Sequence, residues 1–159
     1  NVVYSTSMIS RNFMPYLLAA CDIYAAPSRL EGFGMIQVEA NACGKPVVGI
    51  KAMGLLDTMI HGQTAFLAEI AQEIRLRETI VGDESGYEQG QRITFKRPRI
   101  VDYRASVHDI ANYLMDLMND AELRQQMGQA GRKRAVELFD YRVVAKKFIK
   151  IVSEKLGIS

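Results

Sequence analysis

Hydrophobic positions along the chain gather into short runs separated by longer segments of mixed character. The runs at residues 2–4, 23–26, 46–50 and 64–67 have no polar alternation, which is typical of strands covered on both faces. Helix-like segments lie between them. This alternation predicts an α/β domain with a Rossmann-like parallel sheet and helices on both faces. Ligands bind beyond the carboxyl ends of the strands in such sheets.

Capping residues mark the predicted helices between these strands. Asn12 is a candidate N-cap for a helix with Pro15 in its first turn. A second helix is expected over residues 34–43, because Gly44 suits the position just after a helix end. A short helix over residues 55–60 follows.

The last third of the chain is predicted to be helical. Ser106 and Asp109 resemble a capping box, and Asp120 and Asp140 are further N-cap candidates. One apolar stripe at helical spacing predicts a buried face: Val107, Ile110, Ala111, Leu114, Met115 and Met118.

Residues 69–103 break the pattern, because this charged segment is far longer than an ordinary connection. A hairpin that pairs residues 79–81 with residues 92–95 is expected within it. We interpret the segment as a solvated insertion without a role. The alternative is that the segment covers the ligand site or contacts an acceptor substrate.

The segment from Pro27 to Val48 carries the candidate chemistry. Glu31 precedes a Gly-Phe-Gly turn, and Glu39 lies inside the helix that follows. Glycine permits close approach of a ligand to the backbone, and the free N–H groups of a helix start attract anions. A phosphate at the helix start with a carboxylate on either side suits a sugar joined to a nucleotide through a diphosphate. The segment therefore predicts a nucleotide-sugar site, and Gly34 is expected to face the ligand rather than the core.

Glu39 is predicted to be buried. On a helical wheel with about 100° per residue, it falls within the apolar arc, whereas Gln37 and Asn41 fall on the solvent side. A buried carboxylate needs partners. These are either structural donors or a neighbouring pair of hydroxyls such as those of ribose, and the adjacent turn favours the hydroxyls.

Several motifs in order resemble one enzyme family. Glu31 and Glu39, with seven residues between them, resemble the Glu-x(7)-Glu motif of retaining GT-B glycosyltransferases of group 1. The flanking ACDIYAAPS and ACGKPVV, the later HGQTAFL and the tail ELRQQMGQAGRKRAVELFDY also resemble that family. The resemblance covers residues 1–68 and 104–156.

The resemblance implies a role for each matched residue. Glu31 would be catalytic and contact hydroxyls of the transferred sugar, and Glu39 would hold the ribose. Ser7 and Met8 would border the base, although Ser7 stands where the family often has Gly. The following turn would face the sugar and the diphosphate through Gly32, Phe33, Gly34 and Met35.

The resemblance further implies that residues 1–159 are the donor-binding lobe, a truncated C-terminal half of a GT-B fold without the N-terminal lobe that binds most of the acceptor. The whole enzyme would move a sugar from a nucleoside-diphosphate sugar to an acceptor hydroxyl, in polysaccharide or glycolipid biosynthesis. The 159-residue chain alone is expected to transfer no sugar. The alternatives are a non-catalytic nucleotide-sugar-binding or regulatory module, and an epimerase with the same two lobes.

Composition narrows the remaining choices. The chain has 48% hydrophobic residues, enough for one core, and its net charge of +2 predicts no nucleic-acid partner. Cys21 and Cys43 lie in apolar contexts, as expected for buried free thiols in the cytoplasm. No apolar run is long enough to cross a bilayer. The basic final helices are interpreted as solvated, with a peripheral contact at the inner face of the membrane as the alternative.

Other chemistries lack the residues that they need. His61 and His108 are the only histidines, and neither has neighbours in sequence that suggest a catalytic triad or a metal site. We interpret them as a turn residue and a first-turn helix residue. Since the Asp-x-Asp motif of other glycosyltransferases is also missing, no metal or other cofactor is expected.

Overall fold

Three short parallel strands form the centre of the molecule. A computed structural model describes residues 9–80 and 90–157. Strands β1 (Tyr24–Ala26), β2 (Val47–Ile50) and β3 (Ala65–Ala68) pair in that order, with Ala25 opposite Val48 and Val48 opposite Phe66. The predicted strands at 23–26, 46–50 and 64–67 are therefore confirmed to within one residue. The strand expected at 2–4 lies outside the described residues.

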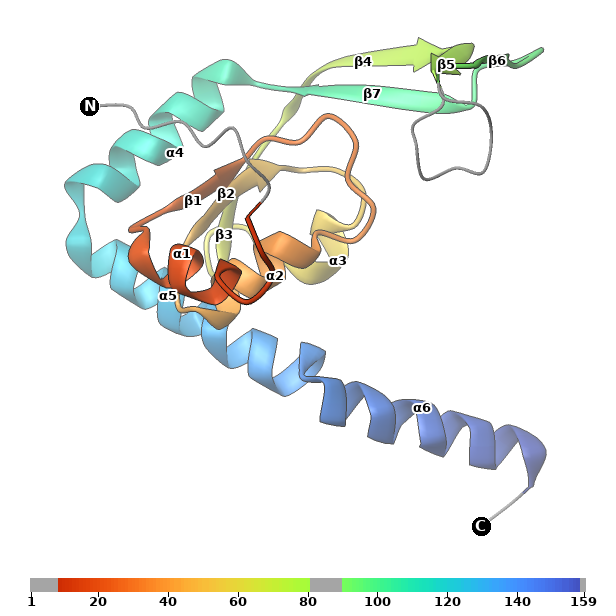
Figure 1. Ribbon diagram of the computed structural model, residues 1–159. Helices are drawn as coiled ribbons and strands as arrows, with labels where there is room; N and C mark the ends of the chain where they lie inside the picture. Colours follow the sequence, from red (N-terminus) through yellow and green to blue (C-terminus); the bar gives the residue numbers. More distant parts are fainter. Residues whose placement is uncertain (1–8, 81–89, 158–159) are drawn as a thin grey trace.

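Helices cover both faces of this sheet, as predicted (Figure 1). Val47 packs with residues of α1, α2 and α3, whereas Val48, its neighbour on β2, packs with Leu117 of α4 and Met127 of α5. Successive strand residues point to opposite faces, so each face acquires its own core. The helices are α1 (Met14–Ala20), α2 (Met35–Ala42), α3 (Leu55–Thr58), α4 (Val107–Asn119), α5 (Ala121–Arg134), the π-helical turn η1 (Ala135–Phe139) and α6 (Tyr141–Leu156).

Side-chain caps begin the three long helices where the sequence predicts them. The Ser106 hydroxyl accepts a hydrogen bond from the Asp109 N–H at 3.2 Å, and the Asp120 and Asp140 carboxylates cap α5 and α6 in the same way. The prediction of Asn12 as an N-cap is wrong, because residues 11–13 form a turn and α1 starts one residue later, after Phe13.

Residues 69–80 and 90–105, here called the arm, leave the carboxyl end of β3 as a long antiparallel ribbon (Figure 1). Strand β4 (Ile70–Leu76) pairs with β7 (Ile100–Ala105), a pairing that the sequence analysis did not predict. Farther out, β5 (Glu78–Ile80) pairs with β6 (Arg92–Thr94), with Thr79 opposite Ile93. The predicted hairpin is confirmed in this part, and Val81 lies outside the described residues.

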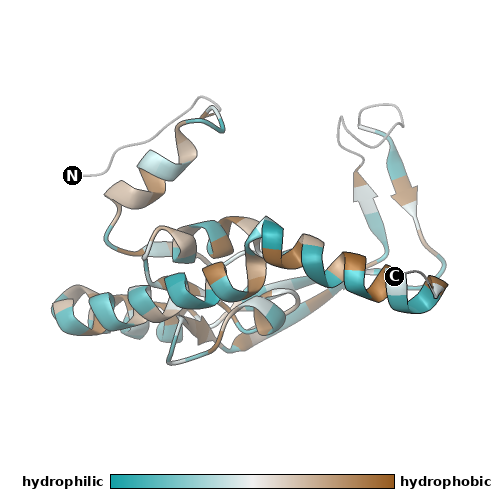
Figure 2. Ribbon diagram, turned by 90° about the horizontal axis from the view of Figure 1, so that it is seen from below, coloured by the Kyte–Doolittle hydropathy of each residue, from teal (hydrophilic) through white to brown (hydrophobic). Residues whose placement is uncertain are grey.

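Apolar positions of the last helices are less buried than predicted. On α4, Leu117 is fully buried, whereas four positions of the predicted buried stripe are exposed, and the prediction is wrong there: Val107, Ala111, Met115 and Met118. Figure 2 shows hydrophobic positions along α6, and none of the described residues of this helix is buried. Among the described helices, none is long and apolar enough to cross a membrane.

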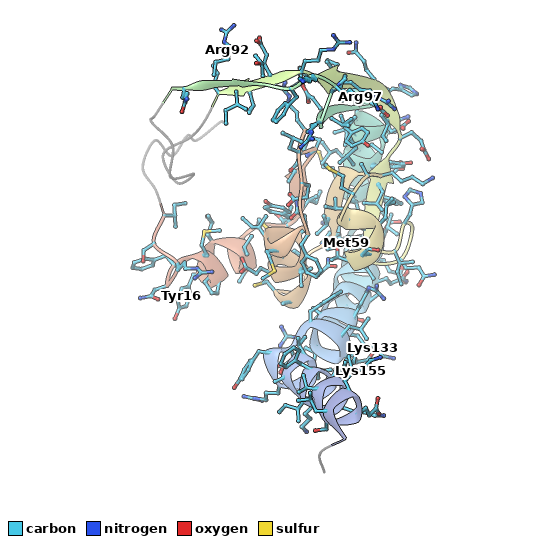
Figure 3. The ribbon with its side chains drawn as sticks, turned by 90° about the vertical axis from the view of Figure 1, so that its right-hand side faces the viewer. Tyr16, Met59, Arg92, Arg97, Lys133 and Lys155 are labelled. Atoms are coloured by element: carbon cyan, nitrogen blue, oxygen red, sulfur yellow. The ribbon has the colours of Figure 1, made fainter. Side chains whose placement is uncertain are left out.

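Basic residues of the arm and of the last helices form two separate groups. Figure 3 places Arg92 and Arg97 on the arm, at the opposite end of the molecule from Lys133 of α5 and Lys155 of α6. These labelled residues therefore do not share one continuous basic face.

A buried amide joins α2 to the start of β3. The Asn41 Nδ2 group donates hydrogen bonds to the Lys45 carbonyl at 3.0 Å and to the Thr64 carbonyl at 3.1 Å. Only 2% of Asn41 is exposed, so the prediction that it faces solvent is wrong. A wheel based on hydropathy places every amide outside, but an amide with fixed partners is stable inside.

We expect Asn41→Ala to lower the free energy of unfolding by about 1–3 kcal/mol, because two carbonyls lose their donor. Urea denaturation of the purified chain measures this loss. Asn112→Ala is the matched control, since Asn112 is exposed on α4 and bonds only to His108 among the described side chains. Equal stability losses in the two variants would show that the Asn41 hydrogen bonds contribute nothing.

Candidate functional site

The carboxyl ends of the three parallel strands meet at one edge of the sheet. The loop after β1 carries Glu31 and the Gly-Phe-Gly turn, and the loop after β2 leads to Gly54. A Cβ atom on Gly54 would lie 2.1 Å from the Gly32 carbonyl oxygen. The two loops are thus in direct backbone contact, and only glycine fits at position 54.

Glu31 is held by three hydrogen-bond donors. Its Oε1 accepts from the Gly34 N–H at 3.1 Å, and its Oε2 accepts from Gln37 Nε2 at 3.0 Å and from Ser28 Oγ at 3.3 Å. These donors fix the carboxylate against the start of α2. Gln37 is completely buried, so the prediction that it faces solvent is wrong, and its contact with Glu31 was missed by the sequence analysis.

A side chain at position 34 would point into the protein core, so the prediction that this position does not face the core is wrong. Its φ of 83° is left-handed. A Cβ atom at this position would lie 2.9 Å from Leu55 Cδ1 and 3.4 Å from Gln37 Oε1. The chain therefore needs glycine at position 34 for backbone conformation and for packing. No sequence signal distinguishes this need from close approach of a ligand.

The start of α2 keeps free N–H groups. Among the described residues, no acceptor bonds to the N–H groups of Met35 or Ile36, whereas the Gly34 N–H is taken by Glu31. Such groups at a helix start attract anions.

Glu39 is exposed, so the prediction that it is buried is wrong. The short helix α2 instead buries Gln37, Val38, Ala40 and Asn41, because both buried amides have hydrogen-bond partners. Glu39 borders a cavity of about 450 Å³ between α1 and α2. Besides Glu39, this cavity is lined by Arg11, Met14, Pro15, Leu18, Met35, Ile36, Ala42 and Cys43.

The end of α5 and the turn η1 support the Gly-Phe-Gly turn from the side. The Phe33 ring, which is 45% exposed, meets the Phe139 ring edge-on with centroids 5.8 Å apart. Arg134 lies over Phe139, and its Nε donates to the Thr58 carbonyl of α3 at 2.8 Å. The sequence analysis did not predict these supporting residues, which lie about a hundred positions after the turn.

The other predicted residues contribute less to this edge. Ser7 and Met8 lie outside the described residues. His61 Nδ1 accepts a hydrogen bond from the Leu67 N–H at 3.0 Å, next to the Tyr113 ring. Burial of Tyr24 raises its pKa, and the negative charge of the nearby Glu31 raises this pKa further. Within the described part of the chain, no group of three or more His, Cys, Asp or Glu residues could hold a metal ion.

Comparison with known proteins identifies the family of the chain. The family described as "Glycosyl transferases group 1" matches residues 2–94, which is more than half of the chain. The chain belongs to this family. The match includes the Gly-Phe-Gly turn together with both glutamates.

Relatives of this glycosyltransferase chain are longer than it is. It is 26% identical over 140 residues to the N-acetyl-alpha-D-glucosaminyl L-malate synthase of Bacillus anthracis. The aligned residues make up 88% of this chain and 28% of that protein. Sucrose-phosphate synthase from Thermosynechococcus elongatus has a similar fold, with a TM-score of 0.67 and 21% identity over 97% of this chain and 30% of that one. Anabaena HepE, solved with UDP and with UDP-glucose, is 25% identical. The UDP complex gives a TM-score of 0.63 and covers 91% of this chain and 30% of that one. These structures are GT-B glycosyltransferases, which confirms the predicted fold class.

We expect Gly34→Ala to destabilise the fold by about 1–3 kcal/mol, because alanine is strained at a left-handed φ and its methyl group would press on Leu55. Thermal and urea unfolding measure the loss. Gly32→Ala is the matched control, since a Cβ there meets nothing within 4 Å. If Gly34→Ala unfolds like the wild type, the packing role of Gly34 is wrong.

Proposed function

We propose that the chain is the donor-binding lobe of a retaining glycosyltransferase, which holds a nucleoside-diphosphate sugar at the carboxyl edge of the sheet. One observation carries the proposal: the N–H groups that start α2 have no acceptor among the described residues, Glu31 is hydrogen-bonded at this helix start, and Glu39 lines the same cavity as Met35 and Ile36. The family membership of the chain supports the same reaction class.

The diphosphate is assigned to the start of α2. The N–H groups of Met35 and Ile36 point out of the first turn without an acceptor among the described residues. The helix dipole adds about 0.3–1 kcal/mol for an anion at such a position. This is modest, so further cations elsewhere in the whole enzyme are expected to share the phosphate charge.

The sugar is assigned to Glu31. A carboxylate has about four acceptor positions, and Gly34, Ser28 and Gln37 occupy three of them. The remaining position can accept a hydrogen bond from one sugar hydroxyl. Since the protein already fixes the carboxylate, little conformational freedom is lost when that hydroxyl binds.

The nucleoside is assigned to the cavity between α1 and α2. Its lining is mostly apolar and includes Glu39, which suits a base beside a ribose. Exposure of Glu39 supports this assignment, because its two oxygens remain available for a neighbouring pair of hydroxyls.

Transfer itself needs a reaction centre that excludes water. The leaving diphosphate can take the proton of the acceptor hydroxyl on the same face of the sugar, so that no protein base is required, while the N–H groups stabilise the developing phosphate charge.

The chain spans about 30% of the length of its relatives, so the acceptor is assigned to the remainder of a longer protein. The exposed apolar positions of α6 offer that remainder a surface.

We expect Glu39→Ala to weaken binding of UDP by about 1–3 kcal/mol, because the ribose hydroxyls lose a charged acceptor. UDP is the first probe because Anabaena HepE was solved with it, and GDP is the second. Isothermal titration calorimetry of the purified chain measures both affinities.

Glu122→Ala is the control, since Glu122 is an exposed glutamate at the start of α5, on a different helix from Glu39. Unchanged affinity in Glu39→Ala for whichever diphosphate binds to the wild type would refute the ribose assignment. A wild-type chain that binds neither diphosphate would refute the donor site.

A further inference from the structure

A buried carboxylate of the arm binds the loop that carries Glu31. Asp102 lies on β7, and only 2% of it is exposed. Its Oδ1 accepts a hydrogen bond from Arg29 Nε at 2.8 Å, and its Oδ2 accepts from Arg29 Nη2. Arg29 stands two positions before Glu31, so this two-bond contact joins residues 73 positions apart directly beside the site.

The backbones of the two segments are joined as well. The Tyr103 N–H donates to the Arg29 carbonyl at 3.1 Å, so the loop after β1 extends the hydrogen bonding of β7. Arg104 Nη2 lies 3.3 Å from Asp102 Oδ2. Arg29 is therefore held through its side chain and its main chain at once, which leaves the Arg29–Glu31 segment little freedom.

The base of the arm is itself fixed. The Ser106 N–H donates to the Glu69 carbonyl at 2.8 Å, and the Glu69 N–H donates to Asp109 Oδ2 at 3.0 Å. Both strands of the arm are thus tied to the first turn of α4, which packs on the sheet. Displacement of the arm would break these hydrogen bonds. The base of the arm can therefore serve as a rigid support for the loop that carries Glu31.

Burial of Asp102 favours a role in geometry over one in stability. Removal of a carboxylate from water is costly, and its attraction to a guanidinium often does no more than offset that cost. The hydrogen bonds from Arg29 hold the pKa of Asp102 below its ordinary value, so the carboxylate stays ionised at neutral pH. A two-bond contact between carboxylate and guanidinium fixes direction as well as distance.

We propose that Asp102 is a positioning residue of the donor site, which acts through Arg29 to hold Glu31 at the transferred sugar. This inference rests on the proposed function for the role of Glu31, but the contact itself does not. The arm then has a role at the site, in place of the solvated insertion that its sequence suggested.

Two measurements on the purified chain test the proposal, with Asp102→Asn and Arg29→Met as the variants. The first uses no ligand and follows hydrogen exchange of the Gly34 N–H, which bonds to Glu31. Both variants are expected to raise its exchange rate more than that of N–H groups in β2. The second measures the dissociation constants of UDP and UDP-glucose, and of GDP and GDP-mannose.

The sugar-specific part of binding is the decisive quantity. Both variants are expected to weaken the binding of UDP-glucose, or of GDP-mannose, by at least about fivefold more than the binding of the matching diphosphate, because only the sugar contacts Glu31. Arg29 is 59% exposed, so Arg29→Met gives the answer even if Asp102→Asn does not fold. Glu73→Gln is the control, since Glu73 pairs with Arg75 on the same arm, and it should change neither readout.

The outcomes separate the two proposals. Equal weakening of diphosphate and sugar nucleotide in both variants, or unchanged exchange of the Gly34 N–H, would overturn the positioning role while the donor site stands. A wild-type chain that binds no nucleotide would refute the proposed function, and the hydrogen exchange would still decide whether Asp102 holds the Glu31 loop.

Discussion

The hydrogen bond from the Gly34 N–H to the Glu31 carboxylate is the contact on which the rest of the site depends. It requires Gly34 to adopt a left-handed backbone conformation, in which a side chain at this position would point toward Leu55 and the core. Once this turn is made, α2 starts beside the carboxylate, and the N–H groups of Met35 and Ile36 have no acceptor in the part of the chain that the structure describes. Glu31 thus serves the fold and the proposed chemistry with the same atoms.

Support for that turn comes from parts of the chain that are remote in sequence. Gly54 contacts it from the loop after β2, Phe139 packs on Phe33 from η1, and Asp102 holds Arg29 from the arm. All of these supports meet at the carboxyl edge of the parallel sheet, where such folds place their ligands. Convergence of rigid elements on one carboxylate is what a preorganised binding site requires.

Much of the fold could be predicted from the sequence, because strands covered on both faces and capped helices leave local signals. The runs that form β1, β2 and β3, and the caps Ser106, Asp120 and Asp140, depend on neighbours in sequence. The pairing of β4 with β7 could not be predicted in this way, since its strands are separated by the outer hairpin and bury little apolar surface.

The errors at the site have a common cause. Hydropathy placed Glu39 inside and Gln37 and Asn41 outside, but the structure has the reverse. The amide nitrogens of both residues have acceptors inside the protein, which are backbone carbonyls for Asn41 and the Glu31 carboxylate for Gln37, and those partners come from the tertiary fold. The sequence argument for a ribose at Glu39 rests on its predicted burial and on the family resemblance, whereas the exposure of Glu39 beside a cavity is the better support for that assignment. The position of α2 could be predicted from the sequence, but which of its side chains are buried could not.

The most direct measurement is a crystal structure of this chain with UDP-glucose, or with GDP-mannose if only that binds. We expect the diphosphate oxygens within hydrogen-bonding distance of the Met35 and Ile36 N–H groups. We also expect the ribose hydroxyls on Glu39 and one hydroxyl of the sugar on Glu31. A nucleotide bound away from the start of α2, or a sugar that leaves Glu31 untouched, would contradict the account.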